Sequence, residues 1–246
     1  GGDGTFDFTL TGTGGSSVPV ITDDGAGSFT WGPKGLVPGG TYTLSEKVLD
    51  GWVSTFKSCT GVTPTSSTAS SVTFTAAAGA VISCDFTNTK RPAISVLKTA
   101  VGGDGTFEFT LTGDGGSMVP VSTTNGVGSY VWDPAGLTPG GTYTLTESVK
   151  VGWVSTFTAC SGVEVTSSTS SSVTFTAPAG AEISCRFTNT KVDETGVLPV
   201  VPGPTPGTGI PITGGVLWGG ITATGLLLSI LGFLLIAAGR RRRTLV

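Results

Sequence analysis

The sequence SCRFTNTK at residues 184–191 nearly repeats SCDFTNTK at residues 83–90. Successive side chains of an extended strand point to opposite faces, so Cys185, Phe187 and Asn189 share one face. This apolar face therefore includes an asparagine. A carboxamide turned toward a protein core costs free energy unless a partner satisfies it, and the rest of the chain has to supply that partner.

The two stretches close two copies of one domain. Residues 1–90 align with residues 102–191 without a gap, and 65 of the 90 positions are identical. Such a tandem repeat predicts two domains, repeat 1 at residues 1–90 and repeat 2 at residues 91–191. Short apolar runs bounded by turn residues, without helical periodicity, predict an all-β fold of immunoglobulin-like β-sandwiches. In the first copy the predicted strands are Thr5–Thr11, Ser28–Trp31, Thr41–Val48, Trp52–Phe56, Ser71–Thr75 and Val81–Thr87.

The two copies differ at their beginnings. A plausible opening strand, residues 93–99, precedes Gly102 in the second copy, whereas the first copy starts at Gly1 without one. No signal peptide is present either, although the features described below require export. We therefore expect this sequence to be a C-terminal fragment of a longer secreted protein.

The composition narrows the possible functions. The 246 residues include no histidine, 12% are charged, and the net charge is −3. Forty glycines and 14 prolines are typical of a turn-rich β-protein. The four arginines at 240–243 stand at the end, and the rest of the chain is acidic. A nucleic-acid partner is disfavoured because phosphate binding needs a basic face.

The four cysteines have the same spacing in each copy. The simplest pairing is one disulfide per domain, Cys59 with Cys84 and Cys160 with Cys185, which implies an oxidising compartment. Two pairs of buried thiols are the alternative. The wide spacing lacks the close cysteine pairs of zinc sites, so we predict no metal and no cofactor.

Two further strands carry a charged residue on an apolar face. The strand that opens the second copy places Lys98 in line with Ile94 and Val96. A central strand at 142–147 places Glu147 in line with its apolar residues, and Glu46 has that position in the first copy. The interior of the second copy is therefore expected to receive an amine and a carboxyl as well as a carboxamide.

Lys98, Glu147 and Asn189 would be a reactive set in such an interior. Desolvation lowers the pKa of a lysine and raises that of a carboxylic acid, so the two can meet as free amine and protonated acid. An acid that hydrogen-bonds the Asn189 carboxamide polarises its carbonyl. Lys98 can then attack and expel ammonia, leaving an amide cross-link promoted by Glu147. The first copy keeps Glu46 and Asn88 but lacks the partner lysine.

Around these groups the second copy resembles the collagen-adhesin B-type (SpaA-like, prealbumin-like) domains of bacterial surface proteins and pili. The matching segments are Lys98, the strand at 142–147 followed by Gly152-Trp153, and Phe187-Thr188-Asn189. The resemblance implies a small β-sandwich with an isopeptide bond between its first and last strands, promoted by a glutamate. The cysteine pair departs from the family, and a disulfide is an alternative covalent staple.

The end of the chain resembles a cell-wall sorting signal. A Pro- and Gly-rich linker at 192–209 precedes residues 210–246, which contain Ile-Pro-Ile-Thr-Gly, an uncharged run at about 216–239 and the four arginines. This run is long enough to cross a bilayer as a helix, with the repeats outside. The resemblance to LPXTG signals implies that a sortase cleaves between Thr213 and Gly214 and joins Thr213 to the peptidoglycan of a Gram-positive wall. A permanent single-pass membrane anchor is the alternative.

Together these patterns predict a non-enzymatic stalk of a bacterial adhesin or pilin-like protein, anchored at the cell surface and stiffened by internal cross-links. One alternative is an adhesive module that binds an unidentified extracellular ligand. Another is the anchoring stalk of a secreted enzyme. For the buried trio, the alternative is that Lys98 reaches solvent, Glu147 pairs at the surface and Asn189 bonds to a turn.

Overall fold

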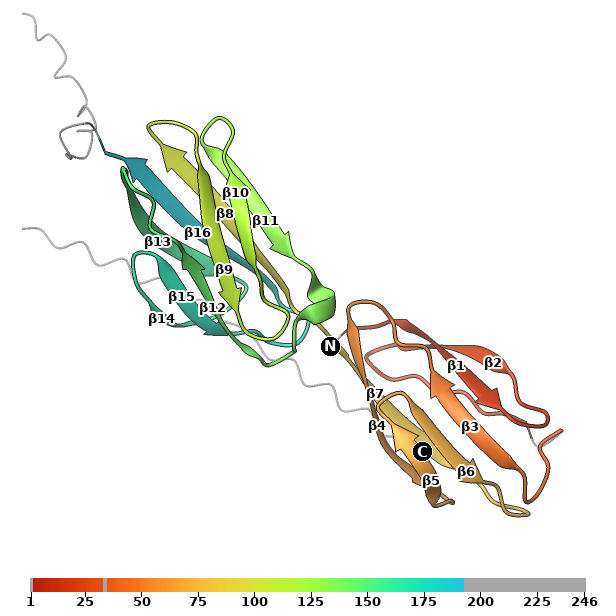
Figure 1. Cartoon of the computed structure of the whole chain (residues 1–246). Helices are drawn as coiled ribbons and strands as arrows, with labels where there is room; N and C mark the ends of the chain where they lie inside the picture. The colour runs from red at the N-terminus through yellow and green to blue at the C-terminus, as the bar shows by residue number, and fades with distance from the viewer. Residues whose placement is uncertain (1, 33–34, 193–246) are drawn as a thin grey trace, which may run out of the picture. The chain divides into compact units, whose positions relative to one another are not determined.

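The computed structural model describes residues 2–32 and 35–192, and both repeats are built from β-strands (Figure 1). Repeat 1 contains β1 (Thr5–Thr11), β2 (Ser17–Ile21), β3 (Thr41–Glu46), β4 (Trp52–Thr60), β5 (Pro64–Thr68), β6 (Ser71–Thr75) and β7 (Ser83–Lys90). Repeat 2 contains β8 (Ala93–Val101), β9 (Thr106–Thr112), β10 (Met118–Ser122), β11 (Val127–Trp132), the short 3-10 helix η1 (Pro134–Gly136), β12 (Thr142–Glu147), β13 (Trp153–Ser161), β14 (Val165–Ser168), β15 (Ser172–Thr176) and β16 (Glu182–Lys191). The all-β prediction is confirmed.

Repeat 2 is a two-layer sandwich. One sheet has the strand order β10-β9-β12-β15-β14, and the other has the order β11-β8-β16-β13. All neighbouring strands are antiparallel except β8 and β16, which pair in parallel from Glu182 opposite Ala93 to Thr190 opposite Val101. The first and last strands of the repeat therefore lie side by side in the same sheet.

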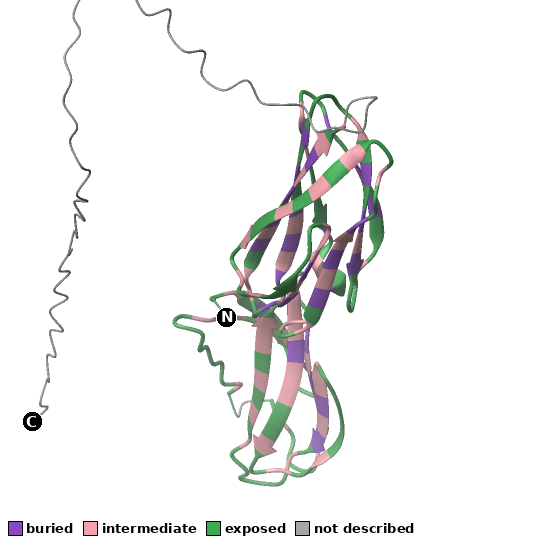
Figure 2. Ribbon diagram, turned by 90° about the vertical axis from the view of Figure 1, so that its left-hand side faces the viewer, coloured by how far each residue is buried: buried purple, intermediate pink, exposed green. Residues whose placement is uncertain are grey.

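Alternating side chains of both sheets fill the interior of repeat 2. Burial alternates along the strands (Figure 2). In β16, for example, every second residue from Ile183 to Asn189 is buried. The period follows from the pleated backbone, which turns successive side chains to opposite faces. Eighteen buried apolar residues form one continuous core. The largest of them are Trp132, Tyr143, Phe107, Phe109, Phe175 and Phe187.

Repeat 1 has the same five-stranded sheet, in the order β2-β1-β3-β6-β5, but its second sheet consists of β4 and β7 alone within the described residues. The strand predicted at 28–31 is wrong for this repeat, although the equivalent segment of repeat 2 is β11. β11 pairs only with β8, and no described residues of repeat 1 take the place of β8. A sequence that can form a strand remains irregular where it has no neighbour.

Each repeat is closed by one disulfide. The pairs are Cys59–Cys84, which joins β4 to β7, and Cys160–Cys185, which joins β13 to β16. In both cases the cysteines lie directly opposite each other on neighbouring antiparallel strands. The predicted pairing is confirmed, and the alternative of buried thiols is excluded.

Candidate functional site

The three polar residues expected in the interior of repeat 2 all lie there. Lys98 projects from β8 and Asn189 from the adjacent strand β16, while Glu147 ends β12 in the opposite sheet. Each of the three is only 1% exposed. The alternative in which they reach solvent is therefore wrong, and the site bridges the two layers of the sandwich.

One carboxylate oxygen contacts both other groups. Lys98 Nζ lies 2.7 Å from Glu147 Oε1, and Asn189 Nδ2 donates a hydrogen bond of 2.8 Å to the same oxygen. The amine and the carboxamide are thus within reach of a single atom that can accept and return a proton. For a side chain to serve as general base and then as general acid, it must lie at this kind of distance from both partners.

The other carboxylate oxygen is held by Ser155. The Ser155 hydroxyl donates to Glu147 Oε2, and its oxygen also lies 3.3 Å from the carbonyl oxygen of Ser170. Ser155 sits opposite Asn189 in the β13–β16 pair. Sequence reasoning missed this residue. The signal was present, because Trp153, Ser155 and Phe157 alternate along one strand and place a hydroxyl on the inward face.

Aromatic rings enclose the amine. Lys98 Nζ lies 4.4 Å from the centre of the Phe107 ring and 5.7 Å from that of Phe109, both on β9. An ammonium ion is attracted to the faces of such rings, yet these rings also keep water away from it. Burial lowers the pKa of Lys98 below its ordinary value, and the contact with Glu147 offsets this only in part. The free amine is the form that can attack a carbonyl carbon.

The orientation of the amide differs from the sequence expectation. Glu147 meets the nitrogen of Asn189, whereas the carbonyl oxygen Oδ1 is buried without a hydrogen-bond partner. An ionised carboxylate can only accept hydrogen bonds, so it faces the N–H group of the amide. In this arrangement Glu147 is placed to exchange a proton with the amide nitrogen of Asn189, and it does not contact the carbonyl oxygen.

Repeat 1 contains the same arrangement without the amine. Glu46 accepts hydrogen bonds from Asn88 Nδ2 and from the hydroxyl of Ser54, as Glu147 does from Asn189 and Ser155. Both Glu46 and Ser54 are only 5% exposed. No lysine among the described residues of repeat 1 forms an ion pair with Glu46.

The other predicted sites lie elsewhere. The sorting-signal residues Thr213 and Gly214, the linker after Val192 and the predicted membrane helix lie outside the described residues. In the described part of the chain, no helix is long and apolar enough to cross a bilayer. There is also no cluster of His, Cys, Asp or Glu side chains in residues 2–32 and 35–192 that could hold a metal ion.

Comparisons with known proteins identify the family. A family model described as a prealbumin-like fold domain, of the SpaA type, matches residues 1–90 and 94–191. No curated protein matches the chain. Among solved structures, the major pilin protein (T-13) from Streptococcus pyogenes serotype GAS131465 is similar at 16% identity, over 77% of this chain and 90% of that chain, with a TM-score of 0.30. Because the family model covers both repeats, this chain belongs to the SpaA-type family of prealbumin-like fold domains.

Proposed function

We propose that the chain is a structural stalk of a cell-surface protein, and that repeat 2 locks itself with an isopeptide bond between Lys98 and Asn189. The observation that carries the proposal is the contact of Glu147 Oε1 with both the lysine amine and the asparagine amide inside a closed core. A core does not normally bury three such groups together, because each loses its hydration.

The bond forms by exchange of one amine for another. Lys98 Nζ gives a proton to Glu147 Oε1 and attacks the side-chain carbonyl carbon of Asn189. A C–N bond to Nζ forms while the bond to Nδ2 breaks. Glu147 returns a proton to Nδ2, which leaves as ammonia, and the carboxylate is regenerated. No other reactant is needed, so the reaction can follow directly from folding.

The site would accelerate cross-link formation by holding the reacting groups in position. Two reactants held in contact react as a single molecule does, which removes most of the entropic cost of their encounter. Lys98 is held by β8 and Asn189 by β16, and these two strands are hydrogen-bonded neighbours. Ser155 fixes Oε2 of Glu147, so that Oε1 stays between the amine and the amide.

Ser155 therefore positions the carboxylate. We expect Ser155→Ala to slow cross-link formation on the order of ten- to a hundredfold, since a hydrogen bond to a charged group contributes about 1.5–3 kcal/mol. The measurement is the intact mass of the full chain at increasing times after a short pulse of cell-free synthesis. Ser155→Thr keeps the hydroxyl and should restore most of the rate. Cross-linking of Ser155→Ala at the parent rate would contradict this role.

The bond would suit a protein under tension. It joins the first strand of the repeat to the last, near the end of β16, so a pull between Ala93 and Lys191 passes through the bond. The residues between Lys98 and Asn189 are then shielded from the load. Disulfides form outside the reducing cytoplasm, which supports an extracellular location.

The intact mass of the full chain, measured after reduction, tests the proposal. The expected result is the sequence mass less one ammonia, with Lys98 and Asn189 in a single branched peptide after proteolysis. The full sequence mass, with the two residues in separate peptides, would refute the cross-link.

For the end of the chain the proposal is attachment by a sortase at Thr213, with residues 192–209 as the spacer. The support is the Ile-Pro-Ile-Thr-Gly sequence followed by an uncharged run and four arginines. Sequencing the C-terminal peptide of the mature protein, taken from the whole cell envelope, decides between the two anchors. A peptide that ends at Thr213 supports sortase attachment, and one that ends at Val246 supports the permanent membrane anchor.

A further inference from the structure

β11 (Val127–Trp132) is an edge strand of repeat 2, with β8 on one side and no described strand on the other (Figure 1). It pairs with β8 in antiparallel fashion, from Val127 opposite Thr99 to Trp132 opposite Ile94. A free strand edge presents unpaired backbone N–H and C=O groups to which another strand can bond. Proteins usually protect such edges with proline, charged side chains, bulges or very short strands.

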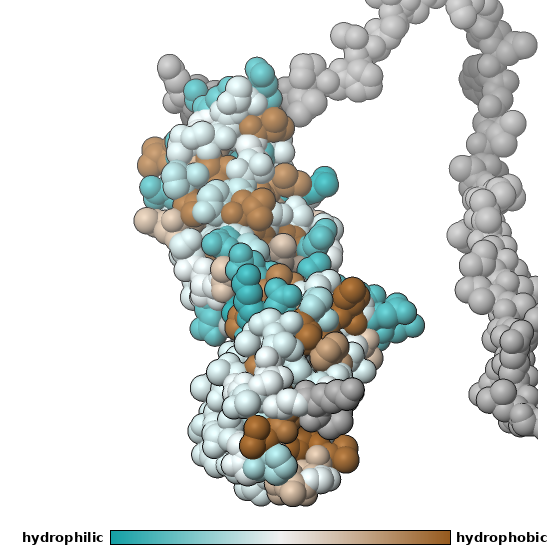
Figure 3. All heavy atoms as spheres, turned by 90° about the vertical axis from the view of Figure 1, so that its right-hand side faces the viewer, coloured by the Kyte–Doolittle hydropathy of each residue, from teal (hydrophilic) through white to brown (hydrophobic). Residues whose placement is uncertain are grey.

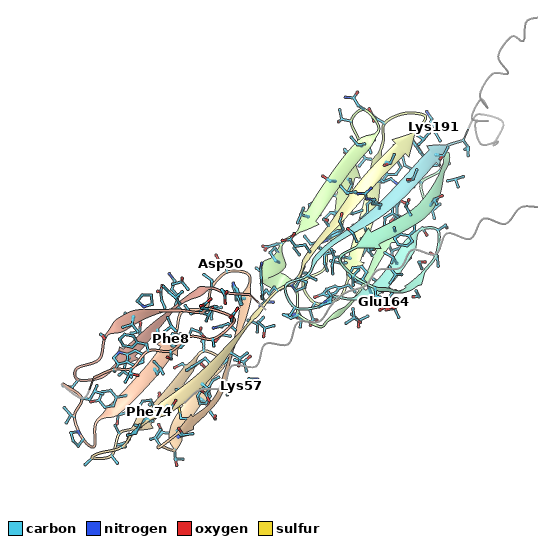
Figure 4. All side chains as sticks on the ribbon, turned by 180° about the vertical axis from the view of Figure 1, so that it is seen from behind. Phe8, Asp50, Lys57, Phe74, Glu164 and Lys191 are labelled. Atoms are coloured by element: carbon cyan, nitrogen blue, oxygen red, sulfur yellow. A yellow bond between two sulfur atoms is a disulfide. The ribbon has the colours of Figure 1, made fainter. Side chains whose placement is uncertain are left out.

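The other three sheet edges of repeat 2 all have protection of this kind. β10 contains Pro120, which offers no N–H group, and the ladder of β13 has a bulge between Phe157 and Ala159. β14, which begins directly after Glu164, labelled in Figure 4, is four residues long and has a bulge of its own. β11 has six residues without a proline or a charge, and its described ladder has no bulge. The side of β11 away from β8 is therefore the open edge of repeat 2.

The hydrogen bonds to β8 show which backbone groups of β11 are free. Just before β11, the N–H of Ala100 donates to the carbonyl oxygen of Gly126 at 2.8 Å. Residues of an antiparallel strand alternate between bonding to the neighbour and pointing away from it, so the even-numbered residues of β11 bond to β8. Of the odd-numbered residues, Val127 bonds within the preceding turn. The N–H and C=O groups of Ser129 and Val131 therefore point to the open edge.

The surface along the open edge is apolar. Val127 and Val131 are 62% and 61% exposed, and Leu97 of β8, which lies on the same outer face, is 38% exposed. Tyr130 is 37% exposed and packs edge-on against the buried Trp132, with the ring centres 5.2 Å apart. In the space-filling view, apolar side chains reach the surface of repeat 2, the upper body in Figure 3. Apolar side chains grouped on a protein surface are typical of an association site.

We propose that β11 pairs with β11 of a second copy of the chain, in antiparallel fashion about a two-fold axis at Tyr130. The pairing joins the four-stranded sheets of the two copies into one sheet. In this register Ser129 of each copy exchanges backbone hydrogen bonds with Val131 of the other copy. All the free backbone groups of the open edge are then satisfied.

The open edge is complementary to itself in this register. A symmetric pair requires this, because both copies contribute the same surface. Tyr130 lies directly opposite Tyr130 of the second copy, and such aromatic cross-strand pairs stabilise a sheet. Asp133, the charged residue that follows β11, falls opposite Val127 of the second copy, so like charges do not meet across the pair. The chain as a whole is acidic, and an uncharged edge lets two copies approach closely without repulsion.

The pair should be weak in solution, because the interface is small. Stable complexes use about 20–30 residues on each side, and β11 contributes six. Pairing requires neither the cross-link nor the anchor proposed above. Where copies stand side by side on one surface, their high local concentration would shift the equilibrium toward pairs. A covalent trap detects the weak pair in solution.

Tyr130→Cys provides that trap in the full chain, purified in mild detergent and oxidised with glutathione disulfide. Residues that lie opposite each other without exchanging hydrogen bonds have Cα atoms about 4.5 Å apart, a distance that a disulfide can span. We expect a covalent dimer on non-reducing gels, linked through the introduced cysteines. Val154→Cys is the matched control, because Val154 is 43% exposed on β13, the opposite edge of the same sheet. This control should form dimers at least about tenfold more slowly.

Further variants test the register. A mixture of Ser129→Cys and Val131→Cys should form mixed dimers, whereas Ser129→Cys alone should stay monomeric, because Ser129 lies opposite Val131 in the pair. Both side chains are exposed, so this mixture also decides the matter if Tyr130→Cys impairs folding. Adding Val131→Lys to Tyr130→Cys should slow dimer formation at least about tenfold, since a lysine at an edge opposes pairing.

Three results would overturn the proposal. The first is equal rates of dimer formation for Tyr130→Cys and Val154→Cys, which would show random collision. The second is an unchanged rate in the presence of Val131→Lys. The third is a monomer in both Tyr130→Cys and the mixture, which would leave the open edge to a different polypeptide.

Discussion

Glu147→Gln is expected to prevent the proposed cross-link in repeat 2 and to lower the stability of this repeat by at least about 3–5 kcal/mol. Glutamine keeps the shape of the side chain but can neither accept the lysine proton nor return a proton to the leaving nitrogen, so no ammonia is lost. The variant then buries Lys98 without its counter-ion, 2.7 Å from a neutral amide instead of a carboxylate. Intact mass and chemical unfolding of the full chain measure both effects.

Repeat 1 offers a matched control for this variant. Glu46→Gln changes the equivalent residue, which accepts from Asn88 and Ser54 but has no lysine beside it. We expect its mass to differ from the parent only by the substitution, and its stability to fall by no more than about 1–3 kcal/mol. If Glu147→Gln still lost ammonia, the carboxylate would not be the promoting group.

The stability of the Glu147→Gln chain should also depend on pH. Burial lowers the pKa of Lys98 in the folded state, while in the unfolded chain the pKa stays near its ordinary value of 10.5. Between these two values the unfolded state binds more protons, so the free energy of unfolding rises with pH. Unfolding curves at successive pH values toward 10.5 should show this rise in Glu147→Gln. The rise should be absent in the parent, where the proposed cross-link converts the lysine nitrogen into an amide.

Reduction of the disulfides is expected to unfold repeat 1 and to leave repeat 2 folded. Each disulfide closes a loop with a sequence separation of 25, and such a link stabilises a domain by about 3–4 kcal/mol. In repeat 1 that is a large share of a domain's usual 5–15 kcal/mol. Its core has five buried apolar residues, against eighteen in repeat 2. The proposed amide bond between β8 and β16 would still hold repeat 2 together when its disulfide is reduced.

Limited proteolysis with and without reductant measures this difference. Cleavage should appear first within residues 2–90, and repeat 2 should survive as a resistant fragment. The double variant Cys59→Ala, Cys84→Ala should show the same cleavage without reductant. The double variant Cys160→Ala, Cys185→Ala should keep repeat 2 resistant. Equal resistance of the two repeats under reduction would contradict the prediction.

The placement of the buried site followed from the sequence because strand alternation is a property of the backbone. In an extended segment every second side chain points to the same face of the sheet. This alternation predicted inward-facing positions for Lys98, Glu147 and Asn189. Whether these three side chains touch depends on the order of the strands in the two sheets, which the alternation of side chains does not determine. Ser155 was missed because Ser and Thr are frequent in all of these strands, so one inward-facing serine does not stand out from its neighbours.

The errors in the fold have a different cause. The strands β2, β5, β10 and β14 were not predicted, because each of them contains proline or is rich in Ser or Thr, and all four lie at sheet edges. Edge strands have a single neighbour and one exposed face, so their apolar pattern is weak. The strand predicted at 28–31 is wrong for the opposite reason. Its sequence suits a strand, but pairing decides whether the strand forms.

The parallel pairing of β8 with β16 has a consequence for how such a protein can change over time. When the first and last strands of a domain run in the same direction, the chain enters the domain at one end and leaves it at the opposite end. In repeat 2 these two ends are about 30 Å apart, the length of a nine-residue strand. Duplicating the coding segment then adds a further link without disturbing the links before it. The 65 identities between the two copies are consistent with a protein that gains length by duplication of a coding segment.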